Sequence, residues 1–222
     1  MRAVARIQSD FPEKFGIPRQ SGLVPELRAK VVLEPEFRNP DVFRGLEGFS
    51  HIWLLWQFSG NRHDGWSPTV RPPRLGGNAR MGVFATRSPF RPNPIGLSCV
   101  KLESVLPDEP ALLVSGADLM DGTPILDIKP YVPYADCHPE ALEGFTGTAQ
   151  MRQLQVQIPP ELLALVPAQS RPALLGVLSQ DPRPAYQNDP ERLYGLCFAG
   201  CDIRFRVQGD VLTVCQITSQ NR

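Results

Sequence analysis

Two arginines, Arg87 and Arg91, lie in a segment whose backbone can hold their side chains over a defined position. Residues 80–86 read as a strand, and the next ten residues contain three prolines and both arginines. Proline fixes φ at about −65°, so the guanidinium groups cannot sweep freely through solvent. Preorganised guanidinium groups suit phosphate or carboxylate ligands. A solvated loop whose arginines pair with nearby acids explains the same pattern, and the loop alone leaves both interpretations open.

The basic charge of this chain is local. The 222 residues have a net charge of zero, with 23 Lys and Arg against 23 Asp and Glu. Between residues 60 and 92, however, arginines far outnumber the single acid Asp64. The arginines of this stretch are Arg62, Arg71, Arg74, Arg80, Arg87 and Arg91. A local cationic surface suits an anionic ligand, whereas global neutrality argues against a protein that coats nucleic acid through bulk charge.

Three further clusters carry polar side chains. Residues 16–22 form a polar turn in which Arg19 and Gln20 can donate hydrogen bonds to an acid or to the edge of a heterocycle. Residues 118–124 follow a predicted strand and read first as a tight turn. Residues 127–134 set an acid, a base and two tyrosines at a strand end, where alternate side chains share a face.

Several common classes of site are not indicated. The chain has no GxSxG, P-loop or HExxH motif and no GxGxxG after a strand, and His51 at the start of an apolar run reads as structural. Five cysteines without a CxxC pair or a histidine cluster predict reduced, buried thiols and no metal. No signal peptide and no apolar run of about 18 residues is present, so we expect a cytoplasmic protein.

The first two thirds of the chain read as β-rich. A short helical turn is expected at residues 39–45, with Asn39 as N-cap and Pro40 at the first helical position. Closely spaced strands with few crossover helices favour an antiparallel barrel or sandwich. The expected strands are residues 4–8, 27–33, 52–58, 80–86, 97–105, 111–117 and 125–128.

A second domain is expected after residue 145, where the residue composition and the periodicity of the sequence change. A glutamine-rich run at residues 149–158 precedes two helical patterns with prolines in their first turns. The predicted domains are therefore residues 1–145 and 146–222. The second has predicted helices at 159–166 and 170–178 and predicted strands at 192–198, 202–207 and 211–217.

Seven motifs in this order closely resemble the TrmO (TsaA-like, YaeB) family. They are PRQ at 18–20, GLEGFSH at 45–51, TVRPPR at 69–74, the segment 76–98, DGTP at 121–124, DIKPY at 127–131 and DPRPAY at 181–186. The resemblance implies an enzyme that uses S-adenosylmethionine to methylate the exocyclic amino nitrogen of threonylcarbamoyladenosine. That nucleoside lies beside the anticodon of tRNAs that decode ANN codons.

The resemblance also implies a fold and a cofactor site. The fold is a mostly β protein with a single-sheeted antiparallel β-barrel as N-terminal domain and a small α+β C-terminal domain, working as a homodimer without a metal. Relatives often carry His-Gln where this chain has Ser59-Gly60, so the side-chain contacts there stay open. The implied cofactor-binding residues are Pro18, Arg19, Gln20, Ser59, Gly60, Arg87, Leu97, Asp118, Leu119, Met120 and Asp121.

Two further roles are expected for individual side chains, from the chemistry of methyl transfer and the negative charge of tRNA. Asp127 or Tyr131 is the expected acceptor of the proton that leaves the substrate nitrogen. The expected contacts with the tRNA anticodon arm are Arg71, Arg74, Arg91, Arg183 and Tyr186. Two alternatives remain: a noncatalytic RNA-binding module with a vestigial pocket, and a methyltransferase that acts on another nucleoside or small molecule.

Overall fold

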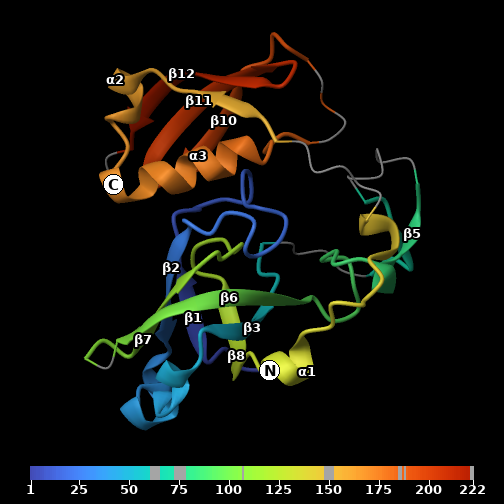
Figure 1. The fold of residues 1–222 in the computed structure, drawn as a ribbon, viewed down its shortest axis with the longest axis vertical. Helices are drawn as coiled ribbons and strands as arrows, with labels where there is room; N and C mark the ends of the chain where they lie inside the picture. Colours follow the sequence, from blue (N-terminus) through green and yellow to red (C-terminus); the bar gives the residue numbers. More distant parts are fainter. Residues whose placement is uncertain are drawn as a thin grey trace.

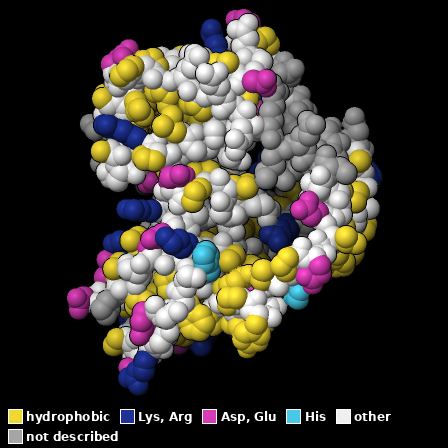
Figure 2. Space-filling view, viewed as in Figure 1, with side chains coloured by type: hydrophobic (Ala, Val, Ile, Leu, Met, Phe, Trp, Pro, Cys, Tyr) yellow, Lys and Arg dark blue, Asp and Glu magenta, His cyan; other side chains and the backbone are white. Residues whose placement is uncertain are grey.

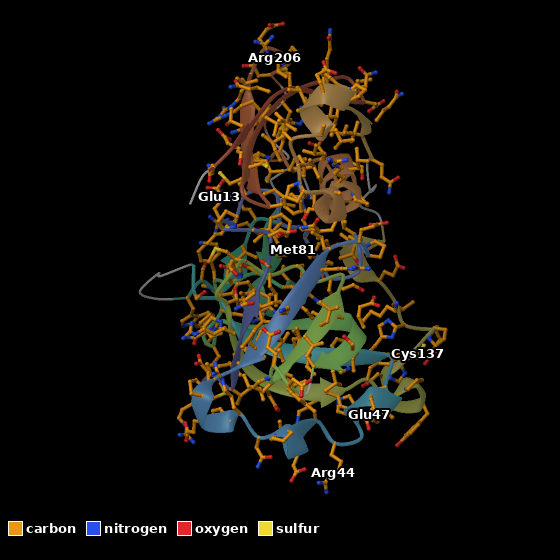
Figure 3. All side chains as sticks on the ribbon, turned by 90° about the vertical axis from the view of Figure 1, so that its left-hand side faces the viewer. Glu13, Arg44, Glu47, Met81, Cys137 and Arg206 are labelled. Carbon is orange, nitrogen blue, oxygen red and sulfur yellow. The ribbon has the colours of Figure 1, made fainter. Side chains whose placement is uncertain are left out.

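The chain forms a barrel and a smaller sheet-and-helix domain (Figure 1). The structure is a computed structural model that describes residues 1–60, 66–72, 79–106, 108–147, 153–184, 187 and 189–220. Figure 3 shows Arg44, Glu47 and Cys137 at the end of the barrel away from the second domain, and Arg206 at the opposite tip of the molecule. Glu13 lies at the junction between the two parts.

The barrel is closed and antiparallel throughout. Its strand order is β1-β2-β7-β6-β3-β8, and alternate residues of each strand face the interior, as in the burial pattern of β3. The predicted single-sheeted barrel is confirmed. Its strands are β1 (Ala5–Gln8), β2 (Arg28–Leu33), β3 (His51–Gln57), β6 (Ile95–Leu106), β7 (Ala111–Ser115) and β8 (Pro124–Pro130).

The expected strand at residues 80–86 is wrong. Only β5 (Met81–Gly82) is extended, and it pairs with β4 (Thr69–Val70). The chain then turns into a 3₁₀ helix, Val83–Ala85, because the amide and the hydroxyl of Thr86 both donate to the Val83 carbonyl, at 3.2 and 2.9 Å. A strand of this length needs a partner of equal length, and β4 offers two residues.

The helical turn predicted at residues 39–45 is present as a 3₁₀ helix, Pro40–Phe43. The Asn39 side chain accepts a hydrogen bond from the Asp41 amide at 3.0 Å, which is the predicted N-cap. The other short helices of this part, over the described residues, are Pro35–Phe37, Leu46–Gly48, α1 (Pro133–Asp136) and Gly144–Thr146.

The C-terminal domain packs α3 against one face of a sheet ordered β10-β11-β12-β9 (Figure 1). The predicted α+β class is confirmed. Strand β9 was not expected, because it lies in the glutamine-rich run and its three residues pair in parallel with β12. The elements are β9 (Gln155–Gln157), α2 (Pro160–Leu163), a 3₁₀ helix (Ala168–Ser170), α3 (Arg171–Ser179), β10 (Tyr194–Phe198), β11 (Cys201–Gln208) and β12 (Val211–Ser219).

The five cysteines are free thiols, but the prediction that they are buried is wrong for most of them. Only Cys201 is buried, whereas Cys137 and Cys215 are exposed. The expectation failed because Cys215 occupies an exposed position of β12 and Cys137 follows the short surface helix α1. Within the described residues, no helix is long and apolar enough to cross a membrane.

Candidate active site

A pocket of about 520 Å³ lies at the end of the barrel where β3 ends and β6 begins. Its walls come from the β1–β2 connection, the residues after β3, the 3₁₀ turn after β5 and the segment before β8. The motifs that the sequence singled out therefore converge at one end of the barrel. The predicted cofactor residues that line the pocket are Pro18, Arg19, Gln20, Ser59, Gly60, Arg87, Leu97, Asp118, Leu119 and Met120.

A chain of hydrogen bonds fixes the acidic side chain of the pocket. Trp56 Nε1 donates to Ser98 Oγ at 3.0 Å, and Ser98 Oγ donates to Asp118 Oδ1 at 2.6 Å. Ser98 is buried, and Trp56 lies directly across the ladder from Gly96, where a Cβ atom would collide with the indole ring. Only glycine fits opposite this tryptophan, so tight packing holds the network in one position.

Burial raises the pKa of Asp118 above its ordinary value. The hydrogen bond from Ser98 and the positive charge of Arg87 act in the opposite direction but do not cancel the effect of burial. Asp118 is the only Asp or Glu among the described residues that line the pocket. The pocket thus contains one carboxylate in a partly desolvated setting, which is typical of functional sites.

Side-chain bonds join the segments at the rim of the pocket. Arg87 Nη1 donates to Gln20 Oε1, which connects the arginine of the proline-rich segment to the Pro-Arg-Gln turn. Lys14 Nζ donates to the Gly60 carbonyl, and a Cβ at Gly60 would collide with the Lys14 side chain. The glycine at position 60 therefore makes room for Lys14, which a larger residue there would displace.

Arg91 stabilises the loop that carries Arg87. Its Nη1 donates to the carbonyls of Thr86, at 2.8 Å, and Ser88, at 3.4 Å. Its guanidinium lies 5.8 Å from the centre of the Phe84 ring. Arg91 also lines the pocket, and these two bonds engage its Nη1 group.

Asp121 lies outside the pocket lining. Its carboxylate accepts a hydrogen bond from the Ser9 amide at 3.0 Å, and its own amide donates to the Phe11 carbonyl at 2.8 Å. Asp121 therefore anchors the start of the β1–β2 connection. The prediction that it binds the cofactor directly has no support from this placement.

The structure does not bring Asp127 or Tyr131 to the pocket of the same chain. The Tyr131 amide donates to the His51 carbonyl at 3.0 Å, and His51 begins β3, whereas the pocket lies where β3 ends. Asp127 forms an exposed ion pair with Lys129, 3.1 Å between Oδ2 and Nζ. Their role as proton acceptors stays a prediction.

A second cavity, a groove of about 1320 Å³, adjoins the pocket and shares Lys14, Arg19 and Arg87 with it. It runs between the side of the molecule that carries β5 and the C-terminal domain, and Figure 2 shows basic side chains in the hollow on that side. The groove also contains Arg71 and Arg80, and no Asp or Glu occurs among its described lining residues. The positive electrostatic potential of this groove therefore favours binding of an anion.

Of the other predicted RNA contacts, Arg71 lines the groove, and Arg74 and Tyr186 lie outside the described residues. Arg183 also lines the groove, but it is 5% exposed. Its Nε and Nη2 each donate to the Asp181 carboxylate at 2.8 Å, and these bonds raise the pKa of Arg183. This ion pair gives Arg183 a structural role within the domain.

Sequence reasoning missed several pocket residues, of which Phe84 is the most conspicuous. Its side chain is 74% exposed and lines both the pocket and the groove. Its position just before the Ala-Thr-Arg-Ser segment was the available signal. The other missed lining residues are Lys14, Ile17, Trp56, Gln57, Phe58, Thr86, Ile95, Gly96 and Thr123. Among the described residues, no cluster of three metal-ligating side chains occurs.

Fold and site define a class of protein: an antiparallel barrel whose mouth holds a small-molecule pocket beside a cationic groove. The family models that match are the tRNA-methyltransferase O N-terminal domain, over residues 6–137, and the TrmO C-terminal domain, over residues 149–220. The chain belongs to the TrmO family, which confirms the resemblance drawn from the motifs.

Relatives cover nearly the whole chain. A tRNA (adenine(37)-N6)-methyltransferase of Escherichia coli K12 is 44% identical over 211 residues, 90% of each chain. A putative S-adenosylmethionine-dependent methyltransferase of Pseudomonas aeruginosa is 42% identical, covering 91% of this chain and 90% of the relative. A crystal structure of TrmO from Pseudomonas aeruginosa superimposes with a TM-score of 0.79 at 34% identity, covering 98% of both chains.

Proposed function

We propose that this chain transfers a methyl group from S-adenosylmethionine to the exocyclic nitrogen of threonylcarbamoyladenosine, next to the anticodon of tRNAs that decode ANN codons. The coarser statement, S-adenosylmethionine-dependent N6 methylation of a tRNA adenosine, rests on family membership and on relatives with that name and similar length. The observation that carries the proposal is the pocket that opens into a cationic groove.

The residues of the pocket fit S-adenosylmethionine. Its volume falls within the roughly 300–1,000 Å³ of small-molecule pockets. The cofactor carries a carboxylate, which suits Arg87 or Arg19, and an ammonium and a sulfonium, which suit the Asp118 carboxylate. Leu97 and Leu119 provide apolar wall for the remainder. Charge and shape thus match without any metal ligand.

When bound, S-adenosylmethionine supplies an electrophilic methyl group. The nitrogen–carbon bond forms as the carbon–sulfur bond breaks, so the protein mainly has to orient the substrate nitrogen and exclude water. The proton of that nitrogen must pass to an acceptor. Asp127 and Tyr131 remain our proposed acceptors, although within the pocket the carboxylate available is Asp118, whose raised pKa makes it a stronger base than an ordinary aspartate.

The target nucleoside reaches the pocket from the groove. Phe84, at the boundary of the two cavities, offers an exposed ring on which an unstacked base can lie. Arg71 and Arg80 lie further along the groove, where backbone phosphates would follow the base. This arrangement supports binding of an anticodon arm, whose bases are accessible in single-stranded form.

The proposal includes a homodimer that works in the cytoplasm and a division into domains at about residue 145. Leu97 at the mouth of the pocket is 46% exposed and is apolar surface that a second copy can cover. The two family-model matches lie on either side of the proposed division. Light scattering of the purified chain measures the oligomeric state directly.

Labelled S-adenosylmethionine and two tRNA preparations, with and without the threonylcarbamoyl group, test the proposal. We expect label in the exocyclic nitrogen of the modified tRNA alone. Equal labelling of both preparations would favour a methyltransferase acting on another nucleoside. Binding of cofactor and tRNA without transfer would favour a noncatalytic RNA-binding module with a vestigial pocket.

A further inference from the structure

The connection between β1 and β2, residues 9–27, belongs to two parts of the molecule at once. One side of it supplies Lys14, Arg19 and Gln20 to the pocket. The other side is part of the core of the C-terminal domain, in which Phe11 and Val24 are buried. In Figure 1 this connection lies directly beneath α3. A movement of the C-terminal domain must therefore move a wall of the pocket.

Gly16 of this connection lies against Leu196 of the C-terminal domain. Gly16 has φ +88°, and a Cβ atom placed on it would collide with Leu196 Cδ1. Leu196 belongs to β10 and is fully buried. The loop backbone thus rests on a strand of the C-terminal domain only two residues before Pro18, where the pocket-lining turn begins.

Other contacts fasten the same connection to the C-terminal domain. Ser170 Oγ donates to Asp10 Oδ2 at 3.1 Å, and the Ala199 amide donates to the Asp10 carbonyl at 3.0 Å. A Cβ atom on Gly176 in α3 would lie 2.6 Å from Val24 Cγ1, which shows how closely the helix approaches the loop. These contacts span the connection from its first residues to its last turn.

The barrel holds this connection mainly near its ends. The Asp121 amide bonds to the Phe11 carbonyl at 2.8 Å, and the Gly22 amide bonds to the Gly116 carbonyl at 2.9 Å. Between these points, the side chains of Lys14 and Gln20 bond to Gly60 and Arg87, and the Ser21 backbone bonds to the Asp118 carboxylate. The C-terminal domain supports the backbone just before the pocket-lining turn from the opposite side, where Gly16 lies against Leu196.

We infer that the C-terminal domain is a positioning element of the cofactor pocket. Leu196 is the residue that fixes the position of the turn bearing Arg19 and Gln20. This role is separate from any contact with tRNA. The inference rests on the proposed function, because it takes the pocket to be the S-adenosylmethionine site. Side chains that support a binding wall from behind fix its geometry as strongly as direct contacts do.

Two glycines of the same connection provide a matched test in the full-length chain. Gly16 and Gly22 both have positive φ, +88° and +79°, so Gly16→Ala and Gly22→Ala introduce similar backbone strain. Only the alanine at position 16 meets Leu196, since nothing lies within 4 Å of a Cβ at Gly22. By calorimetry with S-adenosylmethionine, we expect Gly16→Ala to lose about tenfold in affinity and Gly22→Ala less than about twofold.

A double variant shows whether the contact itself transmits the effect. Leu196→Ala removes the side chain that an alanine at position 16 would strike. The double variant Gly16→Ala/Leu196→Ala should therefore bind S-adenosylmethionine within about twofold of Leu196→Ala alone. Additive losses in the double variant would contradict the inference. Equal affinities of Gly16→Ala and Gly22→Ala would contradict it as well.

A third comparison covers the case in which Gly16→Ala does not fold. Leu212 on β12 is as fully buried in the same domain as Leu196, but it lies two strands away in the sheet. We expect Leu196→Ala, and not Leu212→Ala, to weaken S-adenosylmethionine binding by about threefold or more. Equal effects overturn the inference. Failure of the wild-type chain to bind S-adenosylmethionine would instead overturn the proposed function.

Discussion

The two ends of the barrel carry similar residue types and make different use of them. At the pocket end, loops from distant parts of the chain enclose Arg87 and the hydrogen-bonded chain of Trp56, Ser98 and Asp118. At the far end, Trp53 Nε1 donates to Asp136 at 3.0 Å and packs beside Tyr131, with 5.8 Å between ring centres. The far end satisfies its polar groups locally and leaves them accessible to water.

Two aspartates show what this difference does to chemistry. Burial raises the pKa of Asp118, whereas hydrogen bonds from the Val132 amide and the Trp53 indole lower the pKa of Asp136. Asp136 is a weak base whose lone pairs are engaged, and Asp118 is a stronger base in a desolvated pocket. Residue type at a strand end is thus poor evidence for a site, and enclosure by converging loops is better evidence.

The largest expected effect comes from removing the cation at the pocket rim. We expect Arg87→Ala to lower the affinity for S-adenosylmethionine by roughly 30-fold or more, equivalent to about 2 kcal/mol, because the cofactor carboxylate loses its partner. Calorimetry measures this directly. Arg44→Ala is the control, since Arg44 lies at the far end of the barrel (Figure 3). Unchanged affinity in Arg87→Ala would remove this residue from the cofactor site.

Two glycines test whether the pocket end is packed more tightly than the far end. A Cβ at Gly96 would strike the Trp56 ring, whereas nothing lies within 4 Å of a Cβ at Gly48. We expect Gly96→Ala to lower the free energy of unfolding by about 1–3 kcal/mol, from overpacking. Gly48→Ala should change it by less than about 0.5 kcal/mol. Denaturant unfolding measures both, and equal losses would show that packing does not distinguish the two ends.

The pH dependence of cofactor binding tests the raised pKa of Asp118. The ionised carboxylate exists above that pKa, so affinity for the positively charged cofactor should fall as pH decreases through it. Asp118→Asn keeps a hydrogen-bond acceptor for Ser98 but carries no charge. Its affinity should be lower by about tenfold at neutral pH and flat across the transition. A variant that keeps the wild-type pH profile would assign the titration to another group.

Stability provides a check on the same variant. A raised pKa in the folded state means that ionised Asp118 opposes folding at pH values above its unfolded pKa. Asp118→Asn should therefore keep or raise the thermal midpoint at neutral pH while it loses cofactor affinity. A lower midpoint together with lower affinity would point to a general loss of structure.

The smallest expected effect is at two residues of β8 and its end that lie outside the pocket lining. We expect Asp127→Asn and Tyr131→Phe to bind S-adenosylmethionine within about twofold of the wild type, because neither side chain lines the pocket. Turnover with modified tRNA separates their roles. A large loss of turnover at unchanged cofactor affinity would support them as proton acceptors, supplied by a second copy of the chain. Unchanged turnover would withdraw that assignment.

The sequence predicted most of the barrel because alternation is a local signal. The strands at 52–58 and 97–105 follow from apolar residues on alternate positions, and β3 and β6 lie within two residues of those limits. Residues 80–86 alternate as well, yet among the described residues the strand that pairs with them is the two-residue β4. A strand requires a neighbour, and no pattern within the segment reports whether one exists.

The motifs likewise predicted the location of the pocket, but they did not predict the role of each side chain. Most of the residues carried over from the family line the pocket, because their backbone segments meet there. Asp121 and Arg183 were assigned to ligands through the family motifs, yet both are engaged within the protein. An aspartate that anchors a loop and one that binds a cofactor look the same in a sequence.

By itself, the sequence determined the periodicity of the strands, the turn residues and the family motifs, all of which depend on neighbours along the chain. Only the tertiary structure decided which end of the barrel becomes a site. That choice depends on burial, since Asp118 has a raised pKa only because distant segments exclude water from it. The same holds for the β1–β2 connection, whose position depends on a strand about 180 residues later in the chain.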